Sequence, residues 1–366
     1  MKPMRIAYVI NSVEGGGAAL PVPSIARVLE EAGAEVRVFA LTRRDGRALP
    51  AMEEAGLDPS VRDGGLRDHA AALRWLVREV RAWKATHIWT SLSRATLLGL
   101  AAGPMLGLPV ISWQHAAFLK PWNQRLLRLM QGRATLWVAD SGTVAQFASA
   151  RLGVPQRRLA TWPIYAVDPR MPIARPWQPG ETLRMGSLGR LHPVKGYDVL
   201  IDALSRLQRN GFTAPAVPWR VDIAGEGDER DRLEALARQA GVSQVVFPGY
   251  VEDPRRFLGT RHLYLQPSRS EGFCIAAHEA LTAALPVIAS RVGELQHSIR
   301  PFESGWLCSP DSPATLAECL HHALSNPHRL AEMGRVARGD MLEKFSQQRF
   351  AQTGTAILER IARASA

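Results

Sequence analysis

Short runs rich in β-branched and aromatic residues alternate with helical patterns along this chain, and the alternation starts twice. In the first half the strand-like runs are MRIAYVI, EVRVFAL, THIWTSL, PVISWQH and TLWVADS, with helical patterns such as IARVLEEAG and AALRWLVREVRAWKA between them. Strands that alternate with helices of this length form βαβ units around a parallel sheet. The chain is therefore predicted to be an α/β protein.

A proline-rich segment interrupts the alternation. VDPRMPIARPWQPGE cannot continue a helix or a central strand, so it is predicted to be a linker. Strand-like runs then return as TLRMGSL, WRVDIAG, VVFPG, HLYLQPS and PVIAS. We expect two doubly wound, Rossmann-like domains whose strand ends face each other across a central ligand-binding cleft. The expected divisions are an N-terminal domain over 1–167, a linker over 168–181, a C-terminal domain over 182–345 and a terminal helix over 346–366, with packing of that helix on the first domain left open.

The positive charge of the chain lies almost entirely in its first half. Residues 1–180 hold 23 Lys/Arg against 13 Asp/Glu, whereas residues 181–366 hold 22 against 21. Such an asymmetry favours an anionic partner for the first half, and an Arg-rich composition without any partner is the alternative. No stretch reaches the ~18–20 apolar residues that cross a bilayer.

The start of the chain and the cysteines indicate a cytoplasmic protein. MKPMRIAYVINS has too short an apolar run for a signal peptide and is predicted to be the first strand. Cys274, Cys308 and Cys319 lack metal-ligand spacing, and their odd number favours a reducing compartment.

Two glycine-containing turns in the second half follow predicted strands. In GSLGRLHPVKGYDVLIDAL, Gly189 permits a tight turn, and Arg190 and Lys195 flank a loop that leads into a helix. Two cations at a helix start suit a phosphate or pyrophosphate, although a solvated surface loop explains the pattern as well. Gly225 and Gly227 in DIAGEGDERDRLEALA form a weak G-x-G without the third glycine of a dinucleotide fingerprint.

The segment SRSEGFCIAAHEALTAALPVIAS is apolar enough to be buried, yet it carries two carboxylates and an imidazole. Glu271 precedes a predicted helix, and Glu279 lies about two turns into it. Eight positions bring the two residues to roughly one face, which would line the cleft. The alternative is a helix-terminal charge at Glu271 and a solvated Glu279. His278 points about 100° away from Glu279 and is expected in the core.

Taken together, GRLHPVKG, GEG and PSRSEGFCIAAHEALTAALPVIAS resemble the retaining glycosyltransferases of family 4, which have the two-domain GT-B fold and an E-x7-E motif. The resemblance is strong from Leu183 to Phe345 and weaker over the first half. It implies that Arg190 and Lys195 hold the nucleotide diphosphate and that Glu279 accepts hydrogen bonds from the ribose. It also implies a donor-sugar contact for Glu271, together with the backbone of Gly272, Phe273 and Cys274. Other implied donor-site residues are Gly189 and Gly225, with Phe247 to Gly249 at the base.

In the first half the resemblance points to a loop and a histidine. The loop EGGGAA, with Gly15, Gly16 and Gly17, is similar to the family's glycine-rich loop beside phosphate and acceptor. His115, at the end of PVISWQH, is similar to its active-site histidine at the sugar.

The chain departs from the family pattern at several positions. Cys274 stands where glycine or proline is common, and Ala284 stands where glycine is common. IYAVD replaces the usual Asn-Gly-Val-Asp, and Pro21 and Pro23 require the first helix to begin late. These differences concern the identity of the donor and the acceptor side.

No Asp-x-Asp motif occurs, so we expect neither a metal nor another cofactor, with Arg190, Lys195 and a helix start stabilising the leaving diphosphate. No protein nucleophile stands out. For a retaining enzyme of this family, the acceptor is expected to attack on the face that the diphosphate leaves, and a phosphate oxygen takes its proton.

The predicted function is transfer of a sugar from a nucleotide sugar, with UDP preferred, to a lipid, lipid-linked or polysaccharide acceptor in envelope glycoconjugate synthesis. A GDP-mannose-dependent mannosyltransferase and a nucleotide-sugar epimerase stay open as alternatives. An NAD-dependent oxidoreductase lacks its full fingerprint. A non-catalytic binding protein is supported by basicity alone, and no nucleic-acid partner is expected.

Two basic segments with tryptophan could meet an anionic membrane surface. KPWNQRLLRLMQGR carries Lys120, Arg125 and Arg128, and RWLVREVRAWK carries Arg74 and Arg78. Cationic amphipathic helices suit the inner face of a membrane, where the protein would be peripheral. An ordinary solvated helix face is the alternative.

Overall fold

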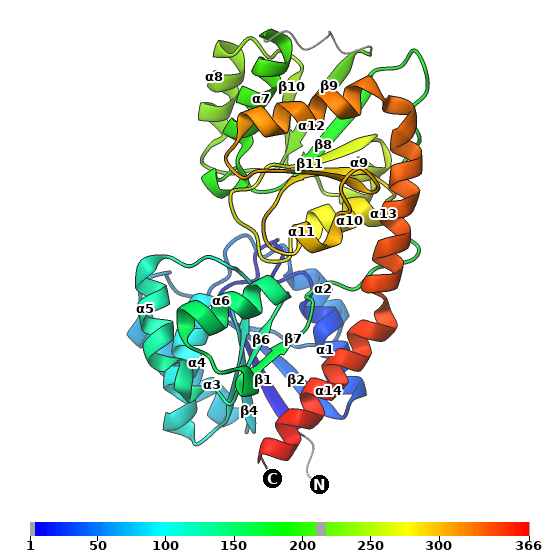
Figure 1. Cartoon of the computed structure of the whole chain (residues 1–366). Helices are drawn as coiled ribbons and strands as arrows, with labels where there is room; N and C mark the ends of the chain where they lie inside the picture. Colours follow the sequence, from blue (N-terminus) through cyan, green and yellow to red (C-terminus); the bar gives the residue numbers. More distant parts are fainter. Residues whose placement is uncertain (1–3, 210–216, 366) are drawn as a thin grey trace. The chain divides into compact units, whose positions relative to one another are not determined.

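The computed structural model describes residues 4–209 and 217–365, and it divides into two compact units. The first unit contains the described residues up to Ala166 and those from Gln348 onward, and the second contains residues 167–347. Figure 1 shows a sheet with flanking helices in each unit.

The first unit is built on a seven-stranded sheet in the order β3-β2-β1-β4-β5-β6-β7. Every neighbouring pair is parallel. The central strands are completely buried, as the apolar runs of the sequence require. The strands are β1 Met4–Ile10, β2 Ala34–Ala40, β3 Ser60–Val61, β4 His87–Ser91, β5 Val110–Gln114, β6 Leu136–Ala139 and β7 Leu159–Thr161.

Helices cover both faces of this sheet. Helices α3, α4, α5 and α6 are neighbours in that order. Pro21 lies at the start of α1 and Pro23 in its first turn, which confirms the expected late beginning of that helix. The helices are α1 Val22–Glu31, α2 Leu49–Glu54, α3 His69–Ala82, α4 Ser93–Leu106, α5 Pro121–Met130, α6 Gly142–Leu152 and the terminal α14 Gln347–Ser365.

Helix α14 packs on the first unit, where Figure 1 draws it in red. The indole Nε1 of Trp162 donates to the carbonyl oxygen of Phe350 at 3.1 Å, and Arg360 donates to the carbonyl oxygen of Leu159 at 2.9 Å. Gly354 has no room for a side chain, because a Cβ there would lie 2.4 Å from the ring of Trp162. The helix is therefore held by both polar and close apolar contacts.

The second unit contains a six-stranded parallel sheet in the order β10-β9-β8-β11-β12-β13. Its strands are β8 Leu183–Leu188, β9 Trp219–Ala224, β10 Val245–Gly249, β11 Leu263–Gln266, β12 Val287–Ser290 and β13 Gly305–Cys308. Its helices are α7 Tyr197–Arg209, α8 Arg230–Gln239, α9 Pro254–Gly259, α10 Ile275–Thr282, α11 Leu295–Ser298, α12 Pro313–Ser325 and α13 Leu330–Lys344. The prediction of two doubly wound Rossmann-like domains is confirmed.

The proline-rich segment after the first unit is fastened to the second one. Asp168 pairs with Arg255 at 2.9 Å, and the amide of Ala174 donates to the carbonyl oxygen of Ala283 at 2.7 Å. Proline removes backbone donors, so side chains and isolated amides supply the contacts that a strand or helix would otherwise make. In the described part of the chain, no helix is both long and apolar enough to span a membrane.

Candidate active site

A lysine and a glutamate from two loops of the second unit form the centre of the candidate site. Lys195 ends a short 3-10 turn, Pro193–Lys195, that follows β8, and Glu271 lies in the loop after β11. The Lys195 Nζ and the Glu271 Oε1 are 2.7 Å apart. Strands β8 and β11 are parallel neighbours, so both loops leave the same carboxyl edge of the sheet, where ligands of such sheets bind.

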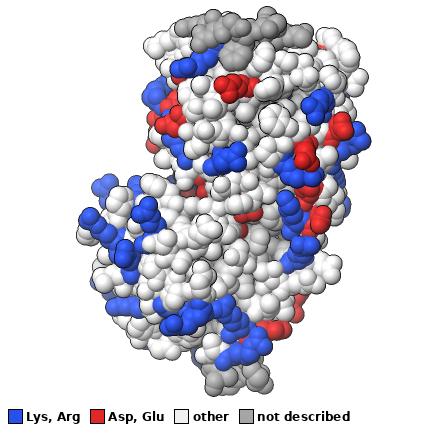
Figure 2. Space-filling model, viewed as in Figure 1, with Lys and Arg blue, Asp and Glu red and all other residues white. Residues whose placement is uncertain are grey.

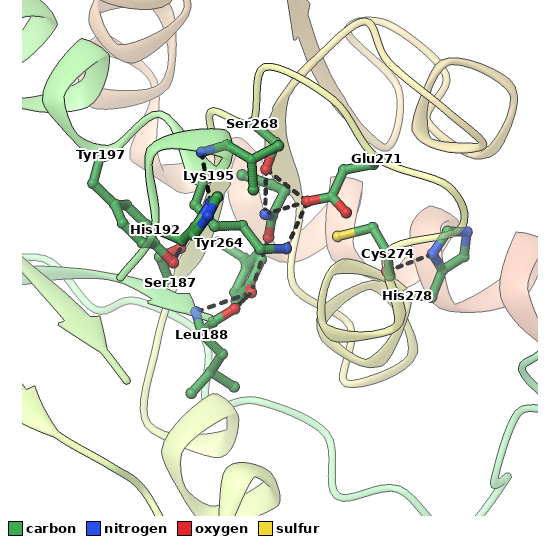
Figure 3. A network of polar contacts seen from close by, with 12 residues as sticks. Ser187, Leu188, His192, Lys195, Tyr197, Tyr264, Ser268, Glu271, Cys274 and His278 are labelled. Carbon is green, nitrogen blue, oxygen red and sulfur yellow. Dashed lines mark hydrogen bonds and ion pairs between the residues drawn. The ribbon is translucent and has the colours of Figure 1, made fainter. Parts of the chain in front are cut away.

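Three donors converge on one oxygen of Glu271 (Figure 3). Besides Lys195, the hydroxyl of Ser268 donates at 2.6 Å and the side-chain amide of Gln266 at 3.1 Å. Burial alone would lower the pKa of Lys195, but the adjacent Glu271 carboxylate outweighs it, so this pKa lies above its ordinary value. This favours Lys195 as an ammonium that is ion-paired with Glu271.

The spacing between Glu271 and Glu279 is not a helical spacing in the structure. Helix α10 begins at Ile275, so Glu271 lies in the preceding loop and Glu279 only about one turn into the helix. The expectation that helical periodicity brings the two carboxylates to one face is wrong, because the backbone between them turns at Cys274. Burial raises the pKa of Glu279 to about 7, and the charge of Arg255 opposes this shift.

Cys274 and Ala284, which depart from the family pattern, both have left-handed backbone conformations. Their φ angles are +70° and +60°, in the left-handed region that favours glycine. Glycine adopts this conformation without strain. Cys274 and Ala284 adopt it although each has a side chain. Burial raises the pKa of the Cys274 thiol, which favours its neutral form.

The G-x-G after β9 permits a close approach of two backbones. A Cβ at Gly225 would lie 2.0 Å from the carbonyl oxygen of Gly189, and one at Gly227 would lie 2.2 Å from that of Leu191. The amide of Gly225 also donates to the carbonyl oxygen of Gly249 at 2.7 Å. The structure thus brings Gly189, Gly225 and Gly249 together, and glycine is required there by space.

The other residues that the family resemblance implies at the donor side differ in exposure. Arg190 is exposed in the loop after β8, whereas Phe247 is buried and its carbonyl oxygen accepts from Arg230 at 2.8 Å. The carbonyl oxygen of Gly272 accepts from the amide of Glu294 at 2.9 Å, and Phe273 is buried. The loop of Gly272 and Phe273 is therefore held by a backbone hydrogen bond and by burial of the Phe273 ring.

His278 lies in the core, which confirms its expected place. Its Nδ1 is 2.9 Å from the carbonyl oxygen of Cys274, its Nε2 is 2.8 Å from the hydroxyl of Ser298, and its ring stacks on Phe273. Burial lowers the pKa of His278 to about 4. A neutral, fully hydrogen-bonded imidazole is expected there to support the loop.

Arg269 and Asp198 were not found from the sequence. Two nitrogens of Arg269 bind the two oxygens of Asp198 at 2.8 and 2.9 Å. Arg269 also donates to the carbonyl oxygen of Pro193 at 2.7 Å, and its amide donates to that of Val194 at 2.8 Å. This clasp joins the loop of Glu271 to the turn of Lys195. The only clue in the sequence was an arginine inside PSRSEG.

In the first unit, His115 directly follows β5 and both of its ring nitrogens have partners. Its Nε2 is 2.6 Å from the hydroxyl of Ser91, and its Nδ1 is 2.9 Å from the Oδ1 of Asp140. The ring stacks on Trp113 at 5.6 Å, and the side chains of His115 and Asp140 are nearly buried. A carboxylate accepts hydrogen bonds, so Nδ1 of His115 donates to Asp140, and the Ser91 hydroxyl is the partner of Nε2. Asp140 and Ser91 were not predicted from the sequence.

The glycine-rich loop follows β1 in the first unit. The amide of Gly15 donates to Asp45 at 2.9 Å, and the carbonyl oxygen of Gly16 accepts from the amides of Ala19 and Leu20 at 3.1 Å. Gly17 is exposed. Over the residues that the structure describes, no three His, Cys, Asp or Glu side chains gather in a way that could hold a metal ion.

Comparison with known proteins decides the family. The model described as Glycosyltransferase Family 4 matches residues 15–164, and the model described as Glycosyl transferases group 1 matches residues 175–340. The chain belongs to glycosyltransferase family 4. As a member of this retaining family, it is a glycosyltransferase that uses a nucleotide sugar. The oxidoreductase, epimerase and non-catalytic alternatives are set aside.

Several family 4 and GT-B proteins are similar over most of the chain. A D-inositol 3-phosphate glycosyltransferase of Acidothermus cellulolyticus is 27% identical over 88% of this chain and 81% of its own length. The structure of HepE from Anabaena in complex with UDP-glucose has a TM-score of 0.82 at 20% identity, over 98% of this chain and 100% of that chain. The lipopolysaccharide outer core galactosyltransferase WaaB has a TM-score of 0.75 at 18% identity, over 98% and 100%. These structures show that the fold is GT-B.

Proposed function

We propose that this family 4 enzyme transfers a sugar from a UDP-sugar to a lipid, lipid-linked or polysaccharide acceptor in envelope glycoconjugate synthesis. The observation that carries the donor side is the ion pair of Lys195 and Glu271 at the carboxyl edge of the second sheet. The structure of HepE with UDP-glucose, a protein of similar fold, supports UDP as the nucleotide of the donor.

Lys195 and Arg190 are proposed to bind the diphosphate. Breaking the bond between the anomeric carbon and the phosphate oxygen leaves negative charge on the diphosphate, and a fixed ammonium stabilises that charge without reorganisation. Arg190 is exposed beside the same strand end, so its guanidinium can offer several donors to a phosphate. On this proposal no divalent metal is needed for departure of the diphosphate.

Glu271 is proposed to accept hydrogen bonds from donor-sugar hydroxyls, with the backbone of Gly272, Phe273 and Cys274 beside it. The acceptor oxygen then bonds to the anomeric carbon on the face that the diphosphate leaves. Attack on that face retains the configuration without a protein nucleophile. The proton of the acceptor hydroxyl goes to a phosphate oxygen of the leaving diphosphate. Glu279 is proposed to accept from the ribose, with Phe247 and Gly249 near the base.

His115 is proposed to contact the donor sugar through Nε2. Asp140 holds the proton on Nδ1, so Nε2 can exchange its hydrogen bond from Ser91 for one from a sugar hydroxyl. The loop of Gly16 and Gly17 is proposed to lie beside phosphate and acceptor.

The acceptor class is supported by charge and by the relatives. The first half of the chain is strongly basic, which favours an anionic acceptor. WaaB is a lipopolysaccharide outer core galactosyltransferase, and the Acidothermus relative is a D-inositol 3-phosphate glycosyltransferase. A GDP-mannose-dependent mannosyltransferase is the second candidate, because Cys274, in the loop proposed to hold the donor, departs from the family pattern.

The test is release of nucleotide diphosphate from UDP-sugars and from GDP-mannose, with and without lipid-linked acceptor. We expect UDP to be released in proportion to glycosylated product. A thermal-shift panel of UDP, GDP, ADP, TDP and NAD gives an independent readout, since a ligand at about 100 times its Kd stabilises by about 2.7 kcal/mol. Stabilisation and turnover with GDP compounds alone would overturn UDP as the nucleotide of the donor.

A further inference from the structure

Helix α5 exposes large apolar side chains that its neighbours do not cover. Leu129 is 82% exposed and Trp122 is 67% exposed, and these are the two highest fractions among the large apolar side chains that the structure describes. Phe118, in the segment just before the helix, is 59% exposed. Exposing a tryptophan and a leucine on one short helix is costly in water, so a covering partner is indicated.

These apolar side chains and the cations of the helix share one outward face. At roughly 100° per residue, Trp122, Arg125 and Leu129 lie on the same side of α5, and Arg128 flanks them. Leu127 lies on the opposite side and is completely buried in the core of the first unit. One side of the helix therefore packs on the core, and the solvent-exposed side carries both arginine and large apolar side chains.

The segment that contains α5 and its sequence neighbours carries cations and no carboxylates. The sequence has no Asp or Glu between Val80 and Ala139. The next acid, Asp140, is buried against His115. Figure 2 shows blue side chains and no red ones over the α5 side of the first unit. A positive potential on an apolar surface suits an anionic partner that also has an apolar interior.

Helix α3, the other basic segment with tryptophan, lacks such a face. Trp75 and Trp83 pack edge-on against Phe39 of β2, with ring centroids 6.4 and 6.0 Å away. Arg74 and Arg78 are exposed. This helix therefore offers cations to the solvent and keeps its tryptophans for the core.

We propose that the face of Phe118, Lys120, Trp122, Arg125, Arg128 and Leu129, here named the α5 face, docks on an anionic lipid bilayer. The tryptophan and leucine enter the boundary between headgroups and acyl chains, and the cations bind the lipid phosphates. Nucleic acid would use the cations but leaves Trp122 and Leu129 unexplained. The inference goes beyond the proposed function, because docking requires neither donor nor acceptor.

The experiment is cosedimentation of the full-length protein with vesicles of phosphatidylglycerol and phosphatidylcholine, compared with phosphatidylcholine alone. We expect binding to the anionic vesicles at low salt and release at high salt, because salt screens exposed charges. The double substitution Trp122→Ala with Leu129→Ala, and the charge reversal Arg125→Glu with Arg128→Glu, should each weaken binding more than tenfold. All four side chains are exposed, so the melting temperature should not change.

The matched control reverses two cations of α3, Arg74→Glu with Arg78→Glu. This variant should bind within about threefold of the wild type, since the attraction between a cation and the anionic bilayer falls off within a Debye length of the surface. Absence of wild-type binding to anionic vesicles would overturn the proposal. An equal loss in the α3 control, or full binding by the Trp122→Ala and Leu129→Ala variant, would also overturn it. Because no sugar is transferred in this assay, its outcome is independent of the proposed donor and acceptor.

Discussion

Arg269 donates two hydrogen bonds of 2.8 and 2.9 Å to the two carboxylate oxygens of Asp198, and it also donates one to the carbonyl oxygen of Pro193. Asp198 lies in the first turn of α7, directly after the turn that carries Lys195. Arg269 belongs to the loop that carries Glu271. One side chain therefore fixes the distance between the two groups of the candidate site, although it touches neither of them. A planar guanidinium can do this because its donors have a fixed fork geometry.

Replacing Arg269 by Ala is predicted to lower kcat tenfold or more while the fold persists, because Lys195 loses its fixed place relative to Glu271. Arg269→Lys should restore little activity, since lysine cannot form the bidentate contact. Steady-state kinetics with melting temperatures measures this. Arg206→Ala is the matched control, because Arg206 makes an exposed ion pair with Asp202 on the outer side of α7. Wild-type kcat in Arg269→Ala would contradict the positioning role.

Glu271→Gln is predicted to lower kcat tenfold or more, which corresponds to about 1.4 kcal/mol of barrier. The carboxylate would be lost as an acceptor for sugar hydroxyls, and Lys195 would lose its partner. His278→Ala should instead leave kcat near the wild-type value and reduce stability by about 1–3 kcal/mol, because Ser298 loses a buried hydrogen-bond partner. Kinetics and denaturant unfolding on both variants distinguish these roles. Abolished turnover in a folded His278→Ala would reverse the assignment.

The Michaelis constant for the donor is predicted to fall as the pH rises through about 7, the raised pKa of Glu279. The ionised carboxylate accepts from ribose hydroxyls better than the neutral acid does. Glu279→Gln should raise this constant and remove its pH dependence, with little change in kcat, because a ribose contact is equal in ground and transition states. A donor Michaelis constant with unchanged pH dependence in the variant would contradict the ribose contact.

The free energy of unfolding is predicted to fall as the pH rises, although donor binding improves. The pKa of Glu279 is higher in the folded chain than the ordinary value of 4.5, so the unfolded chain releases this proton first. The stabilisation from the neutral folded acid is present at low pH and is lost as the pH rises from about 4.5 to about 7. Burial also raises the pKa of Glu294 to about 7, so Glu279→Gln should remove only part of the slope. Denaturant unfolding at several pH values measures it.

Transfer is predicted to persist in the presence of EDTA, because Lys195 and Arg190 supply the positive charge that a metal would otherwise supply. The measurement is product formation after exhaustive chelation, compared with an untreated sample. Complete loss of activity that Mg²⁺ or Mn²⁺ restores would contradict this expectation.

Asp140→Asn is predicted to lower kcat about tenfold, because the carboxylate whose Oδ1 lies 2.9 Å from Nδ1 of His115 would no longer orient that ring. The double variant with His115→Ala should be no slower than His115→Ala alone, because the two residues act as one unit. Asp63→Asn, an exposed position of the same unit, is the control. Additive losses in the double variant would show that Asp140 acts independently of His115.

The fold class could be predicted from the sequence because it depends on local periodicity. Strand and helix patterns follow from which side chains must face a core, and a βαβ alternation leaves a parallel sheet as the ordinary solution. The loops after the strands were predicted for the same reason, which is why Lys195 and Glu271 could be named in advance. The αL position of Ala284 had a clue as well, since glycine is common there in the family.

Only the tertiary structure decided which of these loops meet. Lys195 and Glu271 are 76 positions apart, and they touch because β8 and β11 are neighbours although β9 and β10 lie between them in the chain. No local pattern encodes that strand order, so the clasp of Arg269 on Asp198 and the triad of Ser91, His115 and Asp140 could not be found from sequence. Burial is equally non-local. The sequence made α3 and α5 look alike, and only packing against Phe39 showed that the tryptophans of α3 face the core while Trp122 of α5 faces the solvent.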